Sequence, residues 1–389
     1  MGGTSYDVAV VVDGQPKMTR STKLDFRIPL KLPMIDVHTI GAGGGSIAAL
    51  DGAGILRVGP DSAGAEPGPA CYGRGGSAPT VTDANVVLGR IDWRHPIGFG
   101  EGATLDHDAA RDAVGGLAGR LSMSVEACAE AILTLVTQNM ASRTKLLSIE
   151  QGLDPREFAF ISFGGAGPLH GAAIMREVGI PTMLIPPRPG VLCAQGCTMA
   201  ELRYDAVQSF ERRLSQFEVT ELDAVLHAQR METGAALGLS SETALQYLHV
   251  AQMSYAGQIH SLPVPLELGL DKRAIQTRFE GAYRAEFGNT LGDIDPMIVS
   301  IETSALAAPP ARANRCALAP TTAQAEPESK RAVYFGGWHE TPVYKREKLA
   351  PGMEFEGPAV VNQNDTTSII EPGQHVRVDA DANLVVENS

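Results

Sequence analysis

Several features that mark particular classes of protein are scarce in this sequence. Lys and Arg number 32 against 45 Asp and Glu, which gives a net charge of -13. Nucleic-acid affinity comes largely from Lys and Arg on phosphates, so this acidic balance argues against a nucleic-acid partner. No run of apolar residues approaches the roughly 18 that span a bilayer. The start, Met1–Thr4, has no basic region followed by an apolar one. We therefore expect neither a membrane span nor a signal peptide.

Cysteine is scarce as well. Five cysteines in 389 residues do not form a disulfide framework. Cys193 and Cys197 are the only close pair, and no further Cys or His lies near them at a spacing typical of zinc sites. We expect both to be buried small hydrophobic side chains, and the chain to work in the reducing cytoplasm. With 44% hydrophobic and 20% charged residues, the composition is that of a globular protein of two or three domains.

Residues Phe158–Gly171 predict a buried strand, a glycine turn and a helix that begins at Pro168. Gly164, Gly165 and Gly167 let the main chain turn sharply and approach a bulky group closely. The helix N-terminus carries free N–H groups and a partial positive charge, which suits an anion or a nucleotide. The alternative is a tight strand-to-helix turn without a ligand, and the local pattern does not decide between them.

A second glycine turn stands at the start of the sequence. It is followed by an apolar strand over Asp7–Val12 and a hairpin turn at Asp13–Gly14. Backbone N–H groups and hydroxyls of the turn could hold a phosphate; these belong to Gly2, Gly3, Thr4 and Ser5. Asp7 could bind magnesium through water. The alternative is a frayed terminus.

A carboxylate and an imidazole precede the glycine-rich loop Gly41–Gly45. A strand from Met34 would place Asp36 and His38 on one face, because side chains alternate along a strand. Such a pair can serve in acid–base chemistry or share a metal. The alternative is a structural hydrogen bond that fixes the loop.

Residues 124–151 give the strongest helix pattern, with a natural N-cap, one apolar face and a glycine after the end. Arg143 and Lys145 near its far end are either solvated or in contact with an anion. A short helix is predicted near residue 84, with Thr82 or Asp83 as its cap.

The pattern of apolar and polar residues changes after Tyr204. Amphipathic helices are predicted over Val219–Leu237 and Asp271–Phe287, with two strands between them in Tyr247–Leu266. An alanine- and proline-rich linker follows, and the remaining short strands suggest a small β module. We therefore predict an α/β chain with domains at 1–205 and 206–306, a linker at 307–330, and a β-rich module at 331–389.

Several of these segments together resemble known families. Met1–Val8 resembles the second phosphate motif of the actin-like ATPase superfamily, and Phe158–Gly171 resembles its adenosine motif. More specifically, four segments are similar to the hydantoinase A/5-oxoprolinase family: Asp36–Ser46, Gly59–Gly73, Thr80–Asn85 and Val333–Val361. The motifs are long and in the family's order, and the resemblance covers nearly the whole chain.

This resemblance implies a fold and an activity. The fold would be a partial actin-like ATPase (ribonuclease H-like) domain with a glycine-rich insertion, followed by an α+β region and a small C-terminal β module. Family members use ATP to open cyclic amides such as hydantoins or 5-oxoproline, and relatives carboxylate ketones. ATP phosphorylates the amide oxygen before ring opening. The A-type subunit usually works with a B-type partner.

The resemblance also implies roles for single residues. Gly2, Gly3, Thr4 and Ser5 would contact phosphates, and Asp7 would help to hold magnesium. Gly164, Gly165 and Gly167 would contact the adenosine side. Asp36, His38 and His170 are the candidates for substrate or phosphate chemistry. We expect the pKa of His170 to be lowered if it sits at the positive end of its helix.

One departure from the family leaves the function open. The family normally begins with another actin-like domain that carries a first phosphate motif, and this sequence has no match to it. The chain is then either part of a hydrolase A-type subunit that needs the other half, or a non-catalytic assembly subunit that binds a B-type partner. An ATP-dependent ketone carboxylase subunit is a further alternative. A sugar kinase is disfavoured by the glycine-rich segment and the β module.

Overall fold

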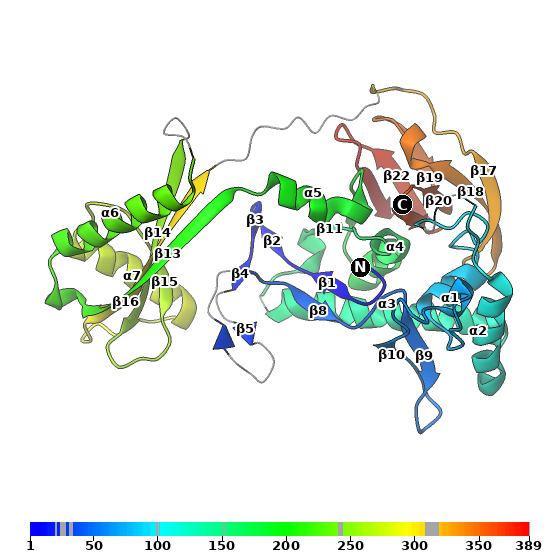
Figure 1. The fold of residues 1–389 in the computed structure, drawn as a ribbon, viewed down its shortest axis with the longest axis horizontal. Helices are drawn as coiled ribbons and strands as arrows, with labels where there is room; N and C mark the ends of the chain where they lie inside the picture. Colours follow the sequence, from blue (N-terminus) through cyan, green and yellow to red (C-terminus); the bar gives the residue numbers. More distant parts are fainter. Residues whose placement is uncertain are drawn as a thin grey trace. The chain divides into compact units, whose positions relative to one another are not determined.

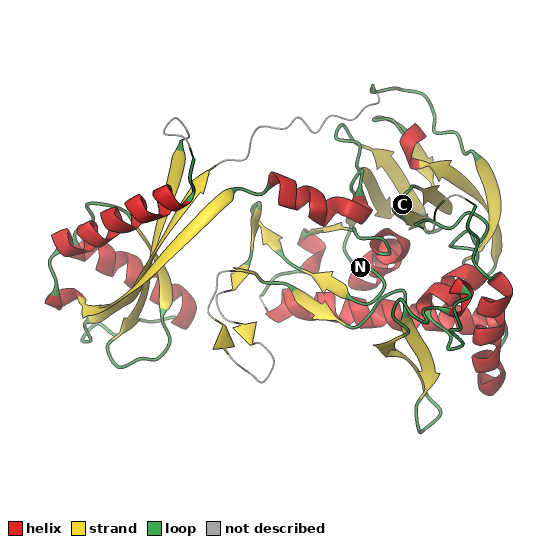
Figure 2. Ribbon diagram, viewed as in Figure 1, coloured by secondary structure: helices red, strands yellow, loops and turns green. Residues whose placement is uncertain are grey.

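The chain is mixed α/β and divides into two compact units (Figures 1 and 2). The structure is a computed structural model that describes residues 1–19, 22–23, 29–30, 34–98, 100, 102–150, 152–239, 244–307 and 319–388. Unit 1 comprises Met1–Gln195 and Asn314–Ser389, and unit 2 comprises Gly196–Ala313. Within the described ranges, no helix has the length and apolarity that crossing a bilayer would require.

A five-stranded sheet organises unit 1. Its strand order is β11 (Ala159–Ile161), β12 (Thr182–Ile185), β23 (Leu384–Asn388), β22 (Gln374–Val378) and β19 (Glu354–Glu356). Strands β11 and β12 are parallel, as expected for strands joined by a helical crossover, and β12 pairs antiparallel with β23. Strands from the predicted module 331–389 therefore complete a sheet that residues 159–185 begin. The predicted domain boundaries remain predictions.

Strand β11 lies at the edge of this sheet. Ile161 is 50% exposed and Ala159 is also exposed, so the prediction of a buried strand was wrong. The physical reason is its position at the edge: among the described residues, β11 pairs in this sheet with β12 alone. Helix α4 (Gly167–Val178) follows with Pro168 in its first turn, as the sequence predicted.

Four helices share one apolar core in unit 1. They are α1 (Val81–Val87), α2 (His107–Leu121), α3 (Val125–Glu150) and α4. The helix predicted over residues 124–151 is confirmed for residues 125–150, and residue 151 lies outside the described residues. Ser124 Oγ accepts a hydrogen bond from the Ala127 N–H at 3.1 Å, as expected for the N-cap. The predicted caps of α1, Thr82 or Asp83, were two or three residues late, because Thr80 is the N-cap.

The other strands of unit 1 form smaller sheets. A four-stranded sheet has the order β17 (Ser329–Tyr334), β18 (Trp338–Lys345), β20 (Ala359–Asn362) and β21 (Thr367–Ile370). The two-stranded pairs are β1 (Tyr6–Val8) with β8 (His38–Ile40), β9 (Ser46–Leu50) with β10 (Leu56–Ser62), β2 (Val11–Val12) with β3 (Gln15–Pro16), β4 (Met18–Thr19) with β7 (Met34–Ile35), and β5 (Thr22–Lys23) with β6 (Pro29–Leu30). The predicted hairpin turn is present, with positive φ at Asp13 and Gly14.

Helix α5 (Leu192–Met199) carries Cys193 and Cys197, and both side chains are exposed. The prediction that they are buried was wrong, because no residue of this short helix is buried.

In its described residues, unit 2 has one antiparallel sheet and two helices longer than one turn that pack against it. Its elements follow in the order β13 (Leu202–Arg213), α6 (Val219–Ala236), β14 (Leu245–Tyr255), β15 (Leu262–Leu266), α7 (Lys272–Phe287) and β16 (Pro296–Ala307). The strand order is β13-β16-β14-β15, and both helices pack against one core. Both predicted helices are confirmed. Residues 308–318 of the predicted linker lie outside the described residues.

Candidate functional site

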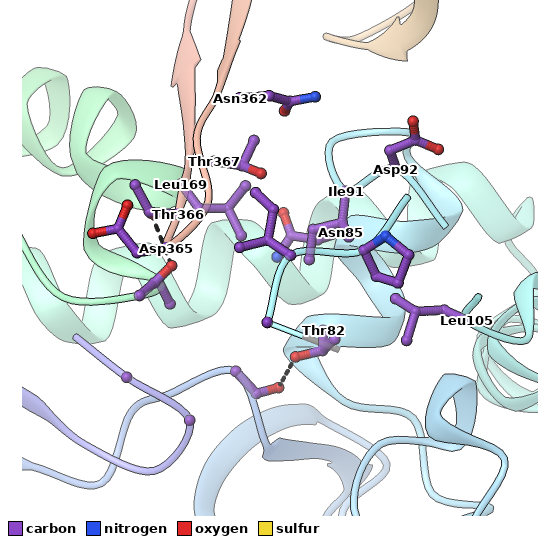
Figure 3. Close-up of a pocket in the computed structure, with 18 of the residues that line it drawn as sticks. Thr82, Asn85, Ile91, Asp92, Leu105, Leu169, Asn362, Asp365, Thr366 and Thr367 are labelled. Carbon is purple, nitrogen blue, oxygen red and sulfur yellow. Dashed lines mark hydrogen bonds between the residues drawn. The ribbon is translucent and has the colours of Figure 1, made fainter. Parts of the chain in front are cut away.

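A cavity in unit 1 brings together the two glycine turns that the sequence singled out (Figure 3). We call it the glycine pocket; its volume is about 260 Å³. Its lining comes from the turn at Gly2 and Gly3, Gly44, helix α1, the loop 91–98, the start of α4, and residues 362–367. Segments distant in sequence therefore meet at one site.

The wall at Gly2 and Gly3 is built from backbone. The N–H of Gly44 donates to the carbonyl of Gly2 at 3.1 Å, and the N–H of Gly45 donates to that of Gly3 at 2.7 Å. A Cβ at Gly43 would lie 2.5 Å from the Gly3 carbonyl oxygen, so this close approach requires glycine. At Gly2 and Gly3 themselves a Cβ would meet nothing within 4 Å, and this backbone is open to a ligand.

The α1 wall is held by a buried carboxylate. Thr80 and Asp83 form a capping box, and Asp83 also accepts the N–H of Ala70 at 3.2 Å and that of Cys71 at 2.8 Å. These bonds fix the glycine- and proline-rich segment that presents Tyr72 to the pocket. Burial, reinforced by the charge of Asp83, raises the pKa of the Cys71 thiol, which stays protonated. Cys71 is therefore structural.

His170 and Asn85 both line the pocket and lie next to each other. The Asn85 Nδ2 lies 3.5 Å from His170 Nε2 and donates to the carbonyl of Val81 at 2.9 Å. Burial, with a contribution from the charge of Arg90, lowers the pKa of His170 to about 3. The predicted direction is confirmed, but its main cause is burial rather than the helix end. The ring is neutral at pH 7 and can act only as a neutral hydrogen-bonding group.

Asn85 leaves one polar atom unused. Its Oδ1 is buried and has no hydrogen-bond partner among the described residues. A buried acceptor without a donor is costly, and such atoms often mark a place where a ligand supplies the partner. Figure 3 shows Asn85 in the pocket, with Asn362 and Thr367 above it and Thr82 below.

The last wall comes from the turn between β20 and β21, which the sequence analysis did not identify. Thr366 Oγ1 donates to the carbonyl of Gly165 at 2.9 Å, and Asp365 Oδ2 accepts the N–H of Gly190 at 2.8 Å. Both bonds tie this turn to loops around α4. No local motif marks these residues, since their partners lie far away in the sequence.

Asp36 and His38 lie together, outside the lining of the glycine pocket. The single strand predicted to carry both was wrong, because β7 ends at Ile35 and β8 begins at His38. His38 Nε2 lies 3.2 Å from Asp36 Oδ1, and Arg143 Nη2 lies 2.5 Å from His38 Nδ1. A guanidinium can only donate, so Nδ1 is the acceptor and Nε2–H points to Asp36. Both ring nitrogens are thus engaged, and His38 orients Asp36.

Asp7 lies opposite Thr39 in the β1–β8 pair. Its Oδ1 accepts from Thr39 Oγ1 at 2.5 Å and its Oδ2 from Ser5 Oγ at 2.9 Å. The described residues contain no group of three or more His, Cys, Asp or Glu that could hold a metal ion. Magnesium is often held by one carboxylate, waters and phosphates, so Asp7 suits a water-mediated contact.

The predicted site residues therefore fall into separate places. Gly2, Gly3, Gly165 and His170 line the glycine pocket. Thr4 is exposed and Ser5 half-buried beside it. Gly164 and Gly167 support the turn from behind: a Cβ on Gly164 would lie 2.4 Å from the Met1 carbonyl oxygen, and one on Gly167 3.5 Å from Ser162 Oγ.

Known proteins are similar to this chain in sequence and in fold. The family model described as hydantoinase/oxoprolinase matches residues 1–206, and the model of the hydantoinase/oxoprolinase C-terminal domain matches residues 226–386. The caprolactamase subunit alpha of Pseudomonas jessenii is 36% identical over 98% of this chain and 56% of that protein. The 5-oxoprolinase 1 of Arabidopsis thaliana is 33% identical over 100% of this chain and 32% of that protein.

Solved structures agree over the whole chain. A nucleotide-free structure of acetone carboxylase superposes with a TM-score of 0.83 at 23% identity, covering 100% of this chain and 57% of that one. The crystal structure of the ATP-dependent caprolactamase from Pseudomonas jessenii gives 0.80 at 35% identity, covering 100% and 58%. The chain thus spans about half the length of these relatives, or less. By its family matches it belongs to the hydantoinase/oxoprolinase family.

Proposed function

We propose that the glycine pocket binds ATP and that the chain is an A-type subunit, or part of one, of an enzyme that opens cyclic amides. The observation that carries this is the convergence of the Gly2–Gly3 turn and the start of α4 on one cavity. Backbone N–H groups of such turns suit phosphates. Caprolactamase and 5-oxoprolinase, to which the chain is similar, are named for cyclic amides.

The residues present fit a nucleotide with magnesium. Asn85 Oδ1 is an acceptor without a donor, and an adenine amino group would supply one. Asp7 would hold magnesium through water. When bound, ATP supplies the phosphoryl group that turns the amide oxygen into a better leaving group.

The chain's own residues would orient the reactants. Gly3 would bind a phosphate oxygen through its N–H group, whereas the Gly2 N–H donates to the Ser5 carbonyl at 3.1 Å and shapes the turn. His38 holds Asp36 by one nitrogen and is held by Arg143 at the other, so Asp36 is the member of the pair placed to accept a proton. A B-type partner would complete the enzyme.

Nucleotide titration tests the proposal. We expect ATP with magnesium to bind the chain and ITP to bind about tenfold more weakly, because inosine presents a carbonyl where adenine presents the amino group. Asn85→Leu should erase this preference. Absence of nucleotide binding, with the chain alone and with a B-type partner, would refute the proposal.

Measurements on the same protein preparation distinguish two other functions from the leading proposal. A non-catalytic assembly subunit would bind its partner without ATP turnover, so ATP hydrolysis is measured with and without that partner. A ketone carboxylase, favoured by the likeness in fold to acetone carboxylase, would hydrolyse ATP in a manner that depends on bicarbonate and ketone. Hydrolysis that depends on a cyclic amide supports the leading proposal.

A further inference from the structure

A second cavity of about 680 Å³ lies in unit 1 beside helix α3. We call it the arginine pocket. Its apolar lining comes from Ile40, Leu56, Val58, Leu135 and Leu146. Leu146 is 43% exposed, so this apolar surface is open to solvent. Apolar cavities with a few polar groups are the usual form of small-molecule sites.

The two pockets share no lining residue. Gly41 and Ala42 line the arginine pocket, whereas Gly44, two residues further along the same loop, lines the glycine pocket. A ligand in the arginine pocket would therefore lie against the same glycine-rich loop without entering the nucleotide site.

Arg143 brings a positive charge to this apolar lining. Its side chain is half-buried, its Nη2 contacts the neutral acceptor His38 Nδ1, and its Nε is buried without a hydrogen-bond partner. Among the described residues, Arg143 has no carboxylate partner. A guanidinium carries five N–H donors, so one contact to His38 leaves most of them unused. A half-buried charge without a counter-charge is less favourable than a paired one, and an anion would supply the missing partner.

Arg57, the other arginine that lines the pocket, differs from Arg143 in its exposure and in having a carboxylate partner. The Arg57 side chain is 71% exposed and its Nε lies 2.8 Å from Asp51 Oδ2. Its charge is solvated and already neutralised. Arg143 is therefore the lining residue suited to an anionic ligand, and Arg57 is its matched control.

We infer that the arginine pocket binds a small organic monoanion, with its carboxylate on Arg143 and its apolar body against Leu56, Leu135 and Leu146. The inference does not depend on nucleotide binding, because it concerns another cavity. The anion forms charge-assisted hydrogen bonds with the guanidinium, and the leucines shield the hydrocarbon from water.

Hexanoate and its neutral analogue hexanamide are the probes, titrated calorimetrically into the full chain. We expect hexanoate to bind about tenfold or more tightly than hexanamide, since a hydrogen bond to a charged group is the stronger kind. Arg143→Gln removes the charge and should remove this preference. Arg57→Gln should leave hexanoate binding unchanged. Ser142→Phe, at an exposed position in the lining, should block the pocket while Arg143 remains.

Equal binding of the two probes, or no binding of hexanoate up to its solubility, would overturn the inference. An equal loss in Arg57→Gln and Arg143→Gln would also overturn it, because it would reveal a diffuse charge effect. If Arg143→Gln does not fold, Ser142→Phe decides by itself: unchanged hexanoate affinity refutes the site. ATP affinity is measured in the same samples. Its retention in Ser142→Phe, with hexanoate lost, separates this pocket from the glycine pocket.

Discussion

The Thr366 hydroxyl connects the β20–β21 turn to the glycine turn before α4, and its removal tests whether that connection shapes the pocket. Thr366 is 1% exposed, and its Oγ1 donates to the Gly165 carbonyl at 2.9 Å. Thr366→Val keeps the shape of the side chain and deletes the donor. A net hydrogen bond contributes about 1 kcal/mol, so we expect the free energy of unfolding to fall by about that amount.

The same change should weaken nucleotide binding. We assume that the Thr366 hydroxyl holds Gly165 in the geometry that a nucleotide requires. Without the hydroxyl, the turn must become ordered when ATP binds, and the free-energy cost of this ordering makes binding weaker. A cost of about 1 kcal/mol corresponds to a roughly fivefold higher Kd for ATP, measured by calorimetry. Thr366→Ser keeps the hydroxyl and should restore most of the affinity.

Thr341 provides a matched control away from the pocket. It is 0% exposed, and its Oγ1 donates to the His339 carbonyl at 3.1 Å. Thr341→Val should cost similar stability in urea unfolding and leave ATP affinity unchanged. The reasoning fails if Thr366→Val binds ATP as tightly as the parent chain, or if Thr341→Val weakens binding equally.

Two further predictions concern glycine packing and buried histidine. Gly43→Ala places a Cβ 2.5 Å from the Gly3 carbonyl oxygen. It should lower the free energy of unfolding in urea by about 1–3 kcal/mol and weaken ATP binding. Gly52→Ala is the control and should leave both unchanged, because its Cβ would meet nothing within 4 Å. The folded pKa of His170, about 3, lies below its ordinary value of 6.5, so the unfolded state binds the proton more readily. The free energy of unfolding should therefore fall as the pH drops from about 6.5 to about 3, with a slope approaching 1.4 kcal/mol per pH unit. His170→Gln should remove the part of this slope that comes from His170. An unchanged slope in the variant would contradict the burial argument.

Local signals predicted the helices well. Helix α3 was predictable because its cap, its apolar face and its terminal glycine agree. The cap of α1 was also within reach, since Thr80 followed by Asp83 three residues later is the spacing of a capping box. The prediction considered only Thr82 and Asp83 and so missed this spacing.

Long-range contacts could not be predicted from the sequence. The bond from Thr366 to Gly165 joins residues that no periodicity relates, so this wall of the pocket could not be predicted. The exposure of Ile161 likewise follows from the edge position of β11, which depends on how the other strands pair. The contact of Arg143 with His38 depends on the packing of α3 beside β8. What the sequence did predict about the site is local: two glycine turns and an Asp–His pair.

The pairing of β12 with β23 has a consequence for biosynthesis. Residues 182–185 find their antiparallel partner only when residues 384–387 have left the ribosome. Unit 2 lies between these two segments in the sequence, so all of its described strands leave the ribosome before residues 384–387. Domains tend to fold as they are synthesised, so unit 2 should become protease-resistant on the nascent chain while the edge of β12 is still unpaired. During that interval β12 is open to wrong partners, and a chaperone that shields extended segments would matter most there.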